Sequence, residues 1–246
     1  IILWDLAADA PKLVLEGHTA TVTRLRVAAH GGLVFSSSWD HTGRVWTLDG
    51  ECVRVLRGHE AAVWSILPAD EAGELVLTAS ADRTIKLFDN ERCTRTFNGH
   101  TDVVRDLAPV DGVGFLSCAN DGTVRLWQLS GECLRVLHAS ETFIYQIGVL
   151  PSGEWLTCSE DRTVRVWSAG SDEPVQSIAH PSIVWACAAT PTGDVLAGCA
   201  DGCAYLWSRS PEHIAEPDAL AIFDEALSSA TMPVQQVEGM TGELEQ

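Results

Sequence analysis

The chain has 246 residues, of which 46% are apolar, and a formal net charge of −18. This length is enough to bury a large core as one β domain, and the acidic balance argues against nucleic-acid binding, which needs a cationic surface to neutralise phosphates. No apolar run approaches the roughly 20 residues that cross a bilayer, and no basic-then-apolar leader opens the chain, so we expect neither a membrane partner nor secretion.

One strand-turn-strand unit recurs along the chain from its first residues. An aromatic residue ends the second strand of each unit, at intervals of 42, 42, 39, 40 and 40 residues. These aromatic residues are Trp4, Trp46, Phe88, Trp127, Trp167 and Trp207. The last five are each preceded, six residues earlier, by an aspartate, at Asp40, Asp82, Asp121, Asp161 and Asp201. A Gly-His dipeptide occurs with His18, His59 and His100, and Ala179-His180 is a weaker copy.

Each complete unit contains segments of alternating polarity, which indicate antiparallel strands. The expected strands of the first complete unit are residues 22–27, 33–38, 43–48 and 52–56. One such sheet cannot bury both of its faces, so the units must stack against each other. Residues 1–5 and 12–15 read as the outer half of a preceding unit, and the last unit lacks a clear outer strand.

A period near 40 residues, with Gly-His and an aspartate before a strand-final Trp, resembles the WD-repeat family. The resemblance covers residues 1–208 and implies an all-β fold, a WD-repeat β-propeller. We count half a blade plus five blades, about five and a half of the seven with which many such propellers close. Because the chain begins at Ile1 and its only methionines are Met232 and Met240, we expect it to be a fragment of a longer product. An open ring exposes strand edges and apolar faces, so we expect this piece alone to aggregate or to bind promiscuously.

The resemblance also implies one internal hydrogen-bond network in each blade. The network joins the Gly-His histidine, a second-strand Ser or Thr, the turn aspartate and the third-strand Trp. The assigned residues are His18, Ser38, Asp40, Trp46, His59, Ser80, Asp82, His100, Asp121, Trp127, Ser159, Asp161, Trp167, His180, Asp201 and Trp207, with Phe88 in one Trp place. A Ser-His-Asp hydrolase is the alternative, but an enzyme needs one exposed nucleophile beside an oxyanion hole, whereas this set recurs in successive blades. We therefore expect no catalysis.

Three later blades depart from the pattern. Ala139-Ser140 replaces Gly-His in an alignment without gaps, so His138 is not the network histidine. Ala119 and Cys199 stand where the second-strand hydroxyl is expected. These blades are therefore expected to depend more on packing.

The repeat stops after Trp207. The expected segments beyond it are a linker at residues 209–217, a helix at 218–230 and a flexible acidic tail at 231–246. Leu220, Phe223 and Leu227 line one face of the helix. We expect this face to pack on the propeller, and the alternative is a helix that binds a partner.

Eight cysteines occur without any Cys-x-x-Cys pair. Cys52, Cys93 and Cys133 repeat at one place of the unit, and Cys118 and Cys158 repeat at another. Both sets are expected to be small apolar core residues. A disulfide framework or a zinc site lacks the ligand spacings it needs, so we expect no metal and no cofactor. Reduced thiols predict a cytoplasmic and nuclear protein.

Several stretches that a WD repeat does not require are similar to the phospholipase A-2-activating protein family. They include Trp39, Cys118-Ala119-Asn120 and the helix-like residues 219–229. In that family the propeller binds ubiquitin, and a C-terminal helical-repeat domain, outside this sequence, docks on a hexameric AAA segregase ATPase, valosin-containing protein. The family is not a lipase. The resemblance therefore implies a ubiquitin-binding adaptor in ubiquitin-dependent degradation; the alternative is a general WD-repeat scaffold of another complex, and the sequence of the C-terminal domains would discriminate between the two.

The candidate ubiquitin site lies on the rim where the inner strand begins and the second strand ends. The candidate residues are Trp39, Trp64, Arg105, Asn120, Phe143, Tyr145, Glu160 and Trp185. Trp64, Tyr145 and Trp185 occupy a position without a fixed consensus, and aromatic residues and Arg are favoured interface anchors. Ubiquitin offers an apolar patch rimmed by basic residues, so aromatic rings amid acidic residues are complementary to it. The alternative is that these rings only plug the central channel.

Overall fold

The computed structural model describes every residue except 29–31, 209, 211–214 and 231–246. The predicted tail at residues 231–246 lies outside the described residues, as does most of the predicted linker at 209–217. The described part contains 21 strands and one helix.

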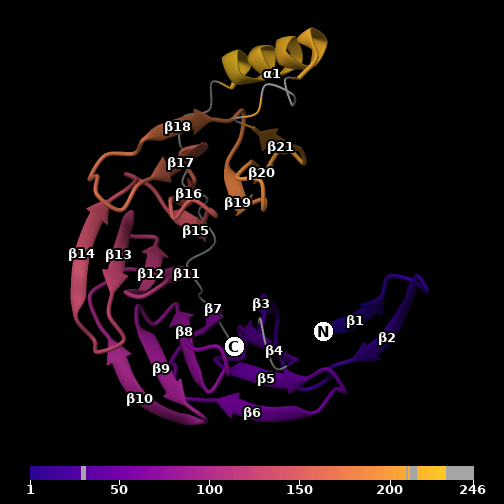
Figure 1. Cartoon of the computed structure of the whole chain (residues 1–246), viewed down its shortest axis with the longest axis vertical. Helices are drawn as coiled ribbons and strands as arrows, with labels where there is room; N and C mark the ends of the chain where they lie inside the picture. The colour runs from indigo at the N-terminus through magenta and orange to yellow at the C-terminus, as the bar shows by residue number, and fades with distance from the viewer. Residues whose placement is uncertain (29–31, 209, 211–214, 231–246) are drawn as a thin grey trace, which may run out of the picture.

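The strands form a hairpin and five sheets, which we call blades 1 to 5 (Figure 1). The hairpin pairs β1 (Ile2–Asp5) with β2 (Ala10–Val14). Blade 1 contains β3 (Val22–Val27), β4 (Leu33–Ser38), β5 (Gly43–Thr47) and β6 (Cys52–Leu56). Blade 2 contains β7 (Val63–Pro68), β8 (Leu75–Ser80), β9 (Ile85–Asp89) and β10 (Arg92–Phe97). Blade 3 contains β11 (Val104–Val110), β12 (Gly114–Ala119), β13 (Thr123–Trp127) and β14 (Cys133–His138). Blade 4 contains β15 (Ile144–Val149), β16 (Trp155–Ser159), β17 (Thr163–Trp167) and β18 (Gln176–Ala179). Blade 5 contains β19 (Val184–Ala189), β20 (Val195–Cys199) and β21 (Ala204–Trp207).

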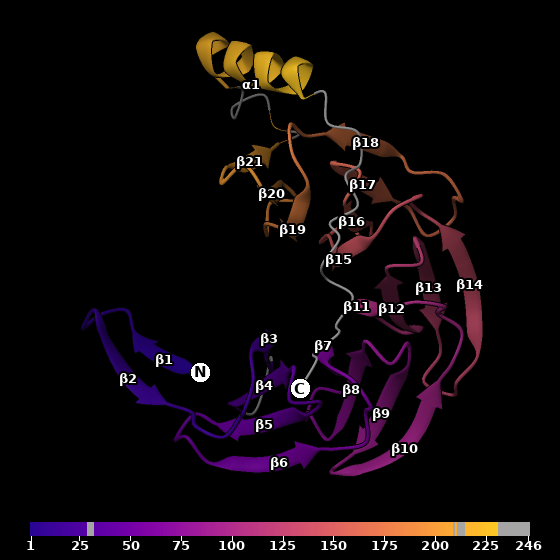
Figure 2. The same ribbon diagram turned by 180° about the vertical axis from the view of Figure 1, so that it is seen from behind.

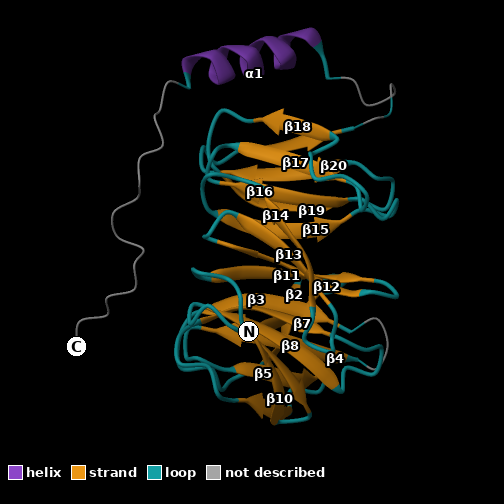
Figure 3. Cartoon of the chain, turned by 90° about the vertical axis from the view of Figure 1, so that its left-hand side faces the viewer, coloured by secondary structure: helices purple, strands orange, loops and turns teal. Residues whose placement is uncertain are grey.

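The blades are arranged radially around a centre, as Figures 1 and 2 show from opposite sides. The inner strands β3, β7, β11, β15 and β19 lie toward the centre, and β6, β10, β14 and β18 lie at the periphery. The hairpin and blade 5 stand at the two ends of an open arc. In the side view of Figure 3 the blades follow one another as layers. This arrangement confirms the predicted incomplete all-β propeller, with a hairpin, four complete blades and a three-stranded last blade.

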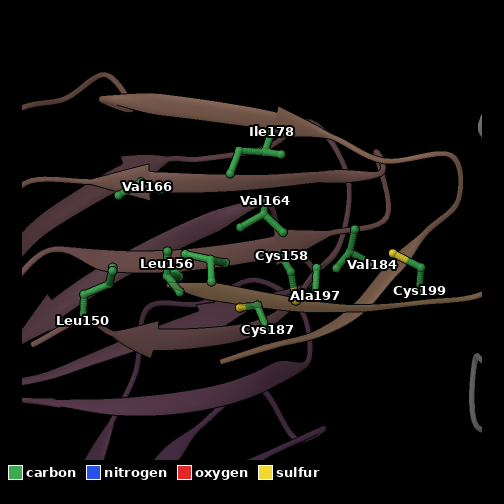
Figure 4. Packing of buried hydrophobic residues seen from close by; sticks show 11 residues of the cluster. Leu150, Leu156, Cys158, Val164, Val166, Ile178, Val184, Cys187, Ala197 and Cys199 are labelled. Atoms are coloured by element: carbon green, nitrogen blue, oxygen red, sulfur yellow. The ribbon is translucent and has the colours of Figure 1, made fainter. Parts of the chain in front are cut away.

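Apolar side chains of neighbouring blades interlock, as Figure 4 shows between blades 4 and 5. Leu156, Cys158 and Val164 of blade 4 pack with Cys187 and Ala197 of blade 5, and none of the five is more than 2% exposed. Because successive side chains of a strand point to opposite faces of the sheet, every second side chain lies in this layer. Burial raises the pKa of the Cys158 thiol well above its ordinary value, so the thiol is a neutral, apolar core group.

The eight cysteines are free thiols, but they are not equally buried. Cys118 and Cys158 are buried, as predicted for core residues. Cys52 and Cys133 are only half-buried and Cys93 is exposed, so the core prediction is wrong for Cys93. Cys52, Cys93 and Cys133 are less buried because they lie on the outer strands β6, β10 and β14, which pair with another strand on one edge only.

The helix α1 (Pro217–Ser229) lies beside the last blade, beyond β18 and β21 (Figure 1). The Phe223 ring packs edge-on against the rings of Tyr205 and Trp207, with both centroid distances 5.3 Å. Arg162 donates from Nη1 to the carbonyl oxygen of Ala230 at 2.7 Å, which ties the end of the helix to blade 4. The helix therefore covers part of the blade edge that lacks an outer strand. In the described part of the chain, no helix is long and apolar enough to cross a membrane.

The hydrogen-bond network of blade 1 uses a different hydroxyl from the predicted one. His18 Nδ1 lies 2.7 Å from Asp40 Oδ2, and its Nε2 lies 2.7 Å from Ser36 Oγ. Trp46 Nε1 donates to the same Ser36 oxygen at 2.8 Å. The assignment of Ser38 to this contact is therefore wrong, because Ser38 Oγ accepts instead from the Asp40 amide at 3.1 Å.

Strand register explains this displacement by two residues. Trp46 pairs with Val34 across β5 and β4, so its indole reaches the diagonal neighbour Ser36. Ser38 lies two residues further toward the turn, on the same face of the strand. The corrected hydroxyls elsewhere are Thr78 in place of Ser80 in blade 2 and Thr157 in place of Ser159 in blade 4.

The network of blade 3 is complete. His100 Nε2 lies 2.7 Å from Ser117 Oγ, and Trp127 Nε1 donates to the same oxygen at 2.9 Å. The expectation that Ala119 deprives this blade of its hydroxyl is therefore wrong. Position 119, like Cys199 in blade 5, is not the place that the hydroxyl occupies.

Blade 4 replaces the missing network histidine with an arginine. Ser140 Oγ donates to Asp161 Oδ2 at 3.2 Å, and Arg165 Nη2 pairs with the same oxygen at 2.6 Å. In blade 3 the corresponding arginine lies so close to Gly99 that a Cβ on that glycine would be 2.8 Å from its terminal nitrogen. Ala139 carries such a Cβ in blade 4. The loss of glycine and the turn of Arg165 toward the aspartate are therefore linked.

In blade 5 the indole bonds directly to the histidine. Trp207 Nε1 donates to His180 Nε2 at 2.9 Å. Ala197 occupies the position that carries the network hydroxyl in the other blades. Asp201, which the resemblance assigned to this network, accepts instead from the Tyr205 hydroxyl at 2.9 Å. This blade keeps the edge-on contact of the histidine and Trp rings but not the hydrogen bonds through a shared hydroxyl.

Both ends of the open arc expose apolar side chains, which predicts self-association. On the hairpin, Trp4 is 54% and Leu6 is 94% exposed, and on blade 5, Leu206 is 58% exposed. An apolar hollow of about 410 Å³ lies at the hairpin end, lined by Ile1, Ile2 and residues 22–25. Light scattering coupled to size-exclusion chromatography is therefore expected to show a mass that rises with concentration, and Trp4→Gln with Leu6→Gln should reduce it. A monomeric peak at every concentration, with a sharp melt, contradicts this expectation.

Candidate functional site

Each inner strand carries a β-bulge at the same place. In β11, Val104 pairs with Ala119 and Asp106 pairs with Cys118, so Arg105 between them has no cross-strand partner. The corresponding unpaired residues are Thr23, Trp64, Tyr145 and Trp185. A bulge redirects the unpaired side chain and often lies next to functional sites. The sequence pattern singled out these positions by their lack of consensus but did not reveal the bulge.

The residue that follows the second strand lies beside the start of the inner strand. Its amide donates to the carbonyl oxygen of a residue just before that inner strand, at 2.9 Å in each of the five blades. The bonds join Trp39 to Thr21, Ala81 to Ala62, Asn120 to Val103, Glu160 to Phe143 and Ala200 to Ile183. The turn residues and the bulged residues therefore lie on one rim of the propeller.

A chain of ring contacts runs along this rim, with one residue from each blade. The rings of Trp39 and Trp64 meet edge-on with centroids 5.7 Å apart. The guanidinium carbon of Arg105 lies 4.3 Å from the Trp64 ring centre and 5.6 Å from that of Tyr145. The Tyr145 and Trp185 rings are 4.5 Å apart. We call these five residues the aromatic arc.

The remaining three candidates flank the aromatic arc. Asn120 Oδ1 accepts from Arg105 Nε at 2.7 Å. The Phe143 ring meets the Tyr145 ring edge-on at 6.5 Å. Glu160 is joined to Phe143 through the backbone and is only 7% exposed. The structure thus brings all eight predicted residues onto one rim.

The aromatic arc holds one cation among acidic neighbours. Burial raises the pKa of Tyr145 to about 12, with a further contribution from the charge of Glu160, so its phenol is neutral. Burial lowers the pKa of Arg105, whereas the negative charges of Asp102 and Glu160 oppose that shift. An arginine stays protonated at neutral pH even so. The arc therefore presents neutral rings around a single guanidinium.

Three blades contain a Ser or Thr, a His and an Asp in the hydrogen-bond order of a hydrolase triad. The hydroxyls of Ser36, Thr78 and Ser117 are all 0% exposed. Those of Ser36 and Ser117 also accept from an indole. A nucleophile enclosed in this way cannot meet a substrate, so these sets hold the blades together. In the described part of the chain, no cluster of three or more His, Cys, Asp or Glu is placed to hold a metal ion.

A buried ion pair on the inner strands escaped the sequence pattern. Asp106 is 0% exposed and accepts hydrogen bonds from both Nε and Nη2 of Arg24, two blades away. It also accepts from Ser65 Oγ at 2.7 Å and from the Ile147 amide at 3.4 Å. One carboxylate therefore joins the inner strands of blades 1 to 4. Charged residues within otherwise apolar strands were the only signal of this contact.

The chain matches the family described as "WD domain, G-beta repeat" over five segments. The matched residues are 10–47, 50–89, 91–128, 131–168 and 172–208. These segments cover β2 of the hairpin and the strands of all five blades, and they extend over more than half of the chain.

Relatives with similar sequences include proteins named for ubiquitin. The chain is 36% identical over 151 residues to Protein DOA1 of Saccharomyces cerevisiae, an alignment covering 61% of this chain and 21% of that protein. It is 34% identical over 146 residues to Ubiquitin homeostasis protein lub1 of Schizosaccharomyces pombe, covering 59% of this chain and 20% of that protein. The chain thus spans about a fifth of the length of these two relatives.

A solved structure shares both the fold and part of the sequence. The crystal structure of the WD40 beta propeller domain of Doa1 superposes with a TM-score of 0.78 at 40% sequence identity. The superposition covers 82% of this chain and 68% of that chain.

Proposed function

Because the chain belongs to the WD-repeat family of β-propellers, and its relatives include Protein DOA1 and Ubiquitin homeostasis protein lub1, we propose that it is a ubiquitin-binding adaptor. It binds ubiquitin through the aromatic arc and acts in ubiquitin-dependent protein degradation. It carries out no catalysis itself. WD-repeat propellers typically act as non-catalytic scaffolds, which present surfaces rather than reactive groups.

The single observation that carries this proposal is the continuity of the aromatic arc across five blades. Trp39 at one end is 43% exposed, and Trp185 at the other end is 41% exposed, so the arc meets solvent at both ends. Rings that served only to plug the channel would be covered. Large aromatic residues and Arg are also the side chains that contribute most at protein interfaces.

Charge supports ubiquitin as the partner. The chain has a net charge of −18, and Glu160 and Asp102 act electrostatically on Arg105 within the arc. An apolar patch rimmed by basic residues, such as the one ubiquitin offers, complements neutral rings set in an acidic surface. Nucleic acid and acidic membrane surfaces carry the wrong charge for it.

The wider role of the adaptor follows from the family resemblance in its sequence. A hexameric AAA segregase ATPase, valosin-containing protein, is the proposed downstream partner, engaged by a C-terminal domain outside this sequence. The cytoplasm and nucleus are the proposed compartments, because the eight cysteines are free and thiols stay reduced there. A general scaffold of another complex is the second candidate, and a rim that binds no ubiquitin would favour it.

Nuclear magnetic resonance titration of isotope-labelled ubiquitin with this chain tests the proposal. We expect shift changes on the apolar patch of ubiquitin, and we expect the combined Trp64→Ala, Tyr145→Ala and Trp185→Ala variant to abolish them. Removing three interface aromatics is expected to weaken binding by a factor of about 100 or more.

A matched control removes exposed apolar side chains away from the rim. Leu134 and Val136 lie on the outer strand β14 and are 40% and 42% exposed. The double variant Leu134→Ala and Val136→Ala should bind ubiquitin as the unchanged chain does. No shift changes at sub-millimolar concentrations of the unchanged chain would exclude the aromatic arc as a ubiquitin site.

A further inference from the structure

Arg105 is held in one orientation at the middle of the aromatic arc. Its guanidinium lies between the rings of Trp64 and Tyr145. The distance from the guanidinium carbon to the ring centre is 4.3 Å for Trp64 and 5.6 Å for Tyr145. Its Nε donates to Asn120 Oδ1 at 2.7 Å. Two rings and one amide thus fix the planar group before a partner arrives, which lowers the entropic cost of using it in binding.

The terminal nitrogens of Arg105 are available to a partner. Within the described part of the chain, the Arg105 side chain makes one hydrogen bond, which Nε donates. Its guanidinium forms no ion pair with a carboxylate of that part. The buried side-chain nitrogens that lack a partner in that part belong to Arg26, Arg44 and Arg125. No nitrogen of Arg105 is among them, so its terminal nitrogens keep contact with solvent and have no protein acceptor among the described residues.

The blade architecture does not need an arginine at this place. The other four bulged residues are a threonine and three aromatics, and each blade still forms its sheet. Thr23 uses its hydroxyl inside the fold, where it donates to the Val63 carbonyl oxygen at 2.7 Å. The terminal nitrogens of Arg105 have no such acceptor within the described residues.

From this geometry we infer that Arg105 determines which apolar surfaces the aromatic arc accepts. Its terminal nitrogens donate hydrogen bonds to a main-chain carbonyl oxygen within the apolar patch of docked ubiquitin, so this inference rests on the proposed function. A surface without an acceptor at that point would cover the guanidinium and leave its donors unpaired, which is costly. A generally apolar rim thereby becomes selective.

A neutral acceptor suits the surroundings better than a carboxylate does. The charges of Asp102 and Glu160 already act on Arg105 and favour its cationic form. A carboxylate approaching the same spot would meet repulsion from these two groups and from the net charge of −18. A carbonyl oxygen uses the same donors without that repulsion.

Ubiquitin affinities of three variants test this inference. Arg105→Met keeps an unbranched apolar stem and removes the donors, and we expect it to weaken ubiquitin binding by a factor of about 10 or more. Asn120→Ala frees the guanidinium and should weaken binding several-fold. The matched control is Arg92→Met, which removes an exposed cation from the outer strand β10, away from the rim, and should change affinity by less than about a factor of two.

Salt dependence distinguishes the two kinds of acceptor. If the acceptor is a neutral carbonyl oxygen, the loss of ubiquitin affinity caused by Arg105→Met should be the same at about 0.05 and 0.5 M salt. A loss of affinity that becomes smaller at high salt would overturn the assignment of a carbonyl. Ubiquitin binding that persists unchanged in Arg105→Met overturns this inference alone, whereas an unchanged chain that binds no ubiquitin overturns it together with the proposed function. If Arg105→Met fails to fold by circular dichroism, unaltered affinity in Asn120→Ala overturns the inference.

Discussion

Replacing Asp106 by Asn is expected to lower the free energy of unfolding by about 3 kcal/mol, as breaking a buried ion pair does. The carboxylate is fully buried and accepts from Arg24, Ser65 and the Ile147 amide. A neutral asparagine amide cannot balance the charge of Arg24. Its NH2 group would also face groups that donate hydrogen bonds to the carboxylate of Asp106. We place the effect at the low end of the range because the Arg24 side chain is 23% exposed. Urea unfolding followed by circular dichroism measures the change.

Two further variants define what the Asp106 result means. Asp172→Asn removes a carboxylate that is 84% exposed and pairs with Arg135 at the surface, so it should change stability by less than about 0.5 kcal/mol. Asp106→Leu combined with Arg24→Met replaces the buried pair by apolar groups and should recover much of the loss. An unaltered urea midpoint in Asp106→Asn would show that the carboxylate does not join the inner strands.

The fold could be predicted because its determinants are local and repeated. An aspartate and a strand-final aromatic residue return about every 40 residues, and alternation between them fixes the strands. In blade 1 three of the four predicted strands match the structure, and the third ends one residue earlier, at Thr47. Such a pattern specifies which residues face each other within a blade, and stacking then follows from the two apolar faces of each sheet.

The hydroxyl of the network could not be chosen from the pattern. Ser36 and Ser38 lie on the same face of β4, two residues apart, and both are fully buried. A period of two cannot distinguish them. The choice depends on how far the Trp46 indole reaches across the strand pairing, which is a property of register and side-chain direction.

The candidate site was predictable in position but not in structure. The residues on the rim follow from the order of strands within a blade. The bulge at Arg105, and the contacts of its guanidinium with Trp64 and Tyr145, depend on side chains from three different blades. The turn of Arg165 toward Asp161 is of the same kind, since a Cβ on Ala139 displaces it from its usual place. Contacts between repeats leave no periodic signal in the sequence.

Structural and binding roles alternate along a single turn of blade 3. Asp121 satisfies His100 and Thr123 inside the blade. Its neighbour Asn120 orients Arg105 on the rim. The two side chains bond to different parts of the blade, so Asp121 can hold the fold while Asn120 serves the rim. A substitution at each position should therefore affect a different property.

Asp121→Ala is expected to lower the free energy of unfolding by about 2–3 kcal/mol at neutral pH while leaving ubiquitin affinity within about a factor of two. The aspartate accepts from His100 Nδ1 at 2.9 Å, from the Thr101 amide at 2.9 Å and from the Thr123 hydroxyl at 2.7 Å. Truncation leaves the buried His100 and Thr123 side chains without this partner. Urea unfolding measures the first effect, and titration of labelled ubiquitin measures the second.

The pH dependence of this loss identifies the carboxylate charge as its cause. Burial opposes the ionisation of Asp121, but hydrogen bonding to His100 and the charge of His100 prevail and hold its pKa well below the ordinary value of 3.8. A lowered pKa means that the carboxylate stabilises the fold fully above about pH 5 and progressively less as pH falls below about 4, where the unfolded chain takes up the proton first. The difference between the unchanged chain and Asp121→Ala should therefore be constant from about pH 7 to 5 and shrink toward about pH 3. A difference that stays constant down to about pH 3 would mean that the ionised carboxylate does not hold blade 3 together.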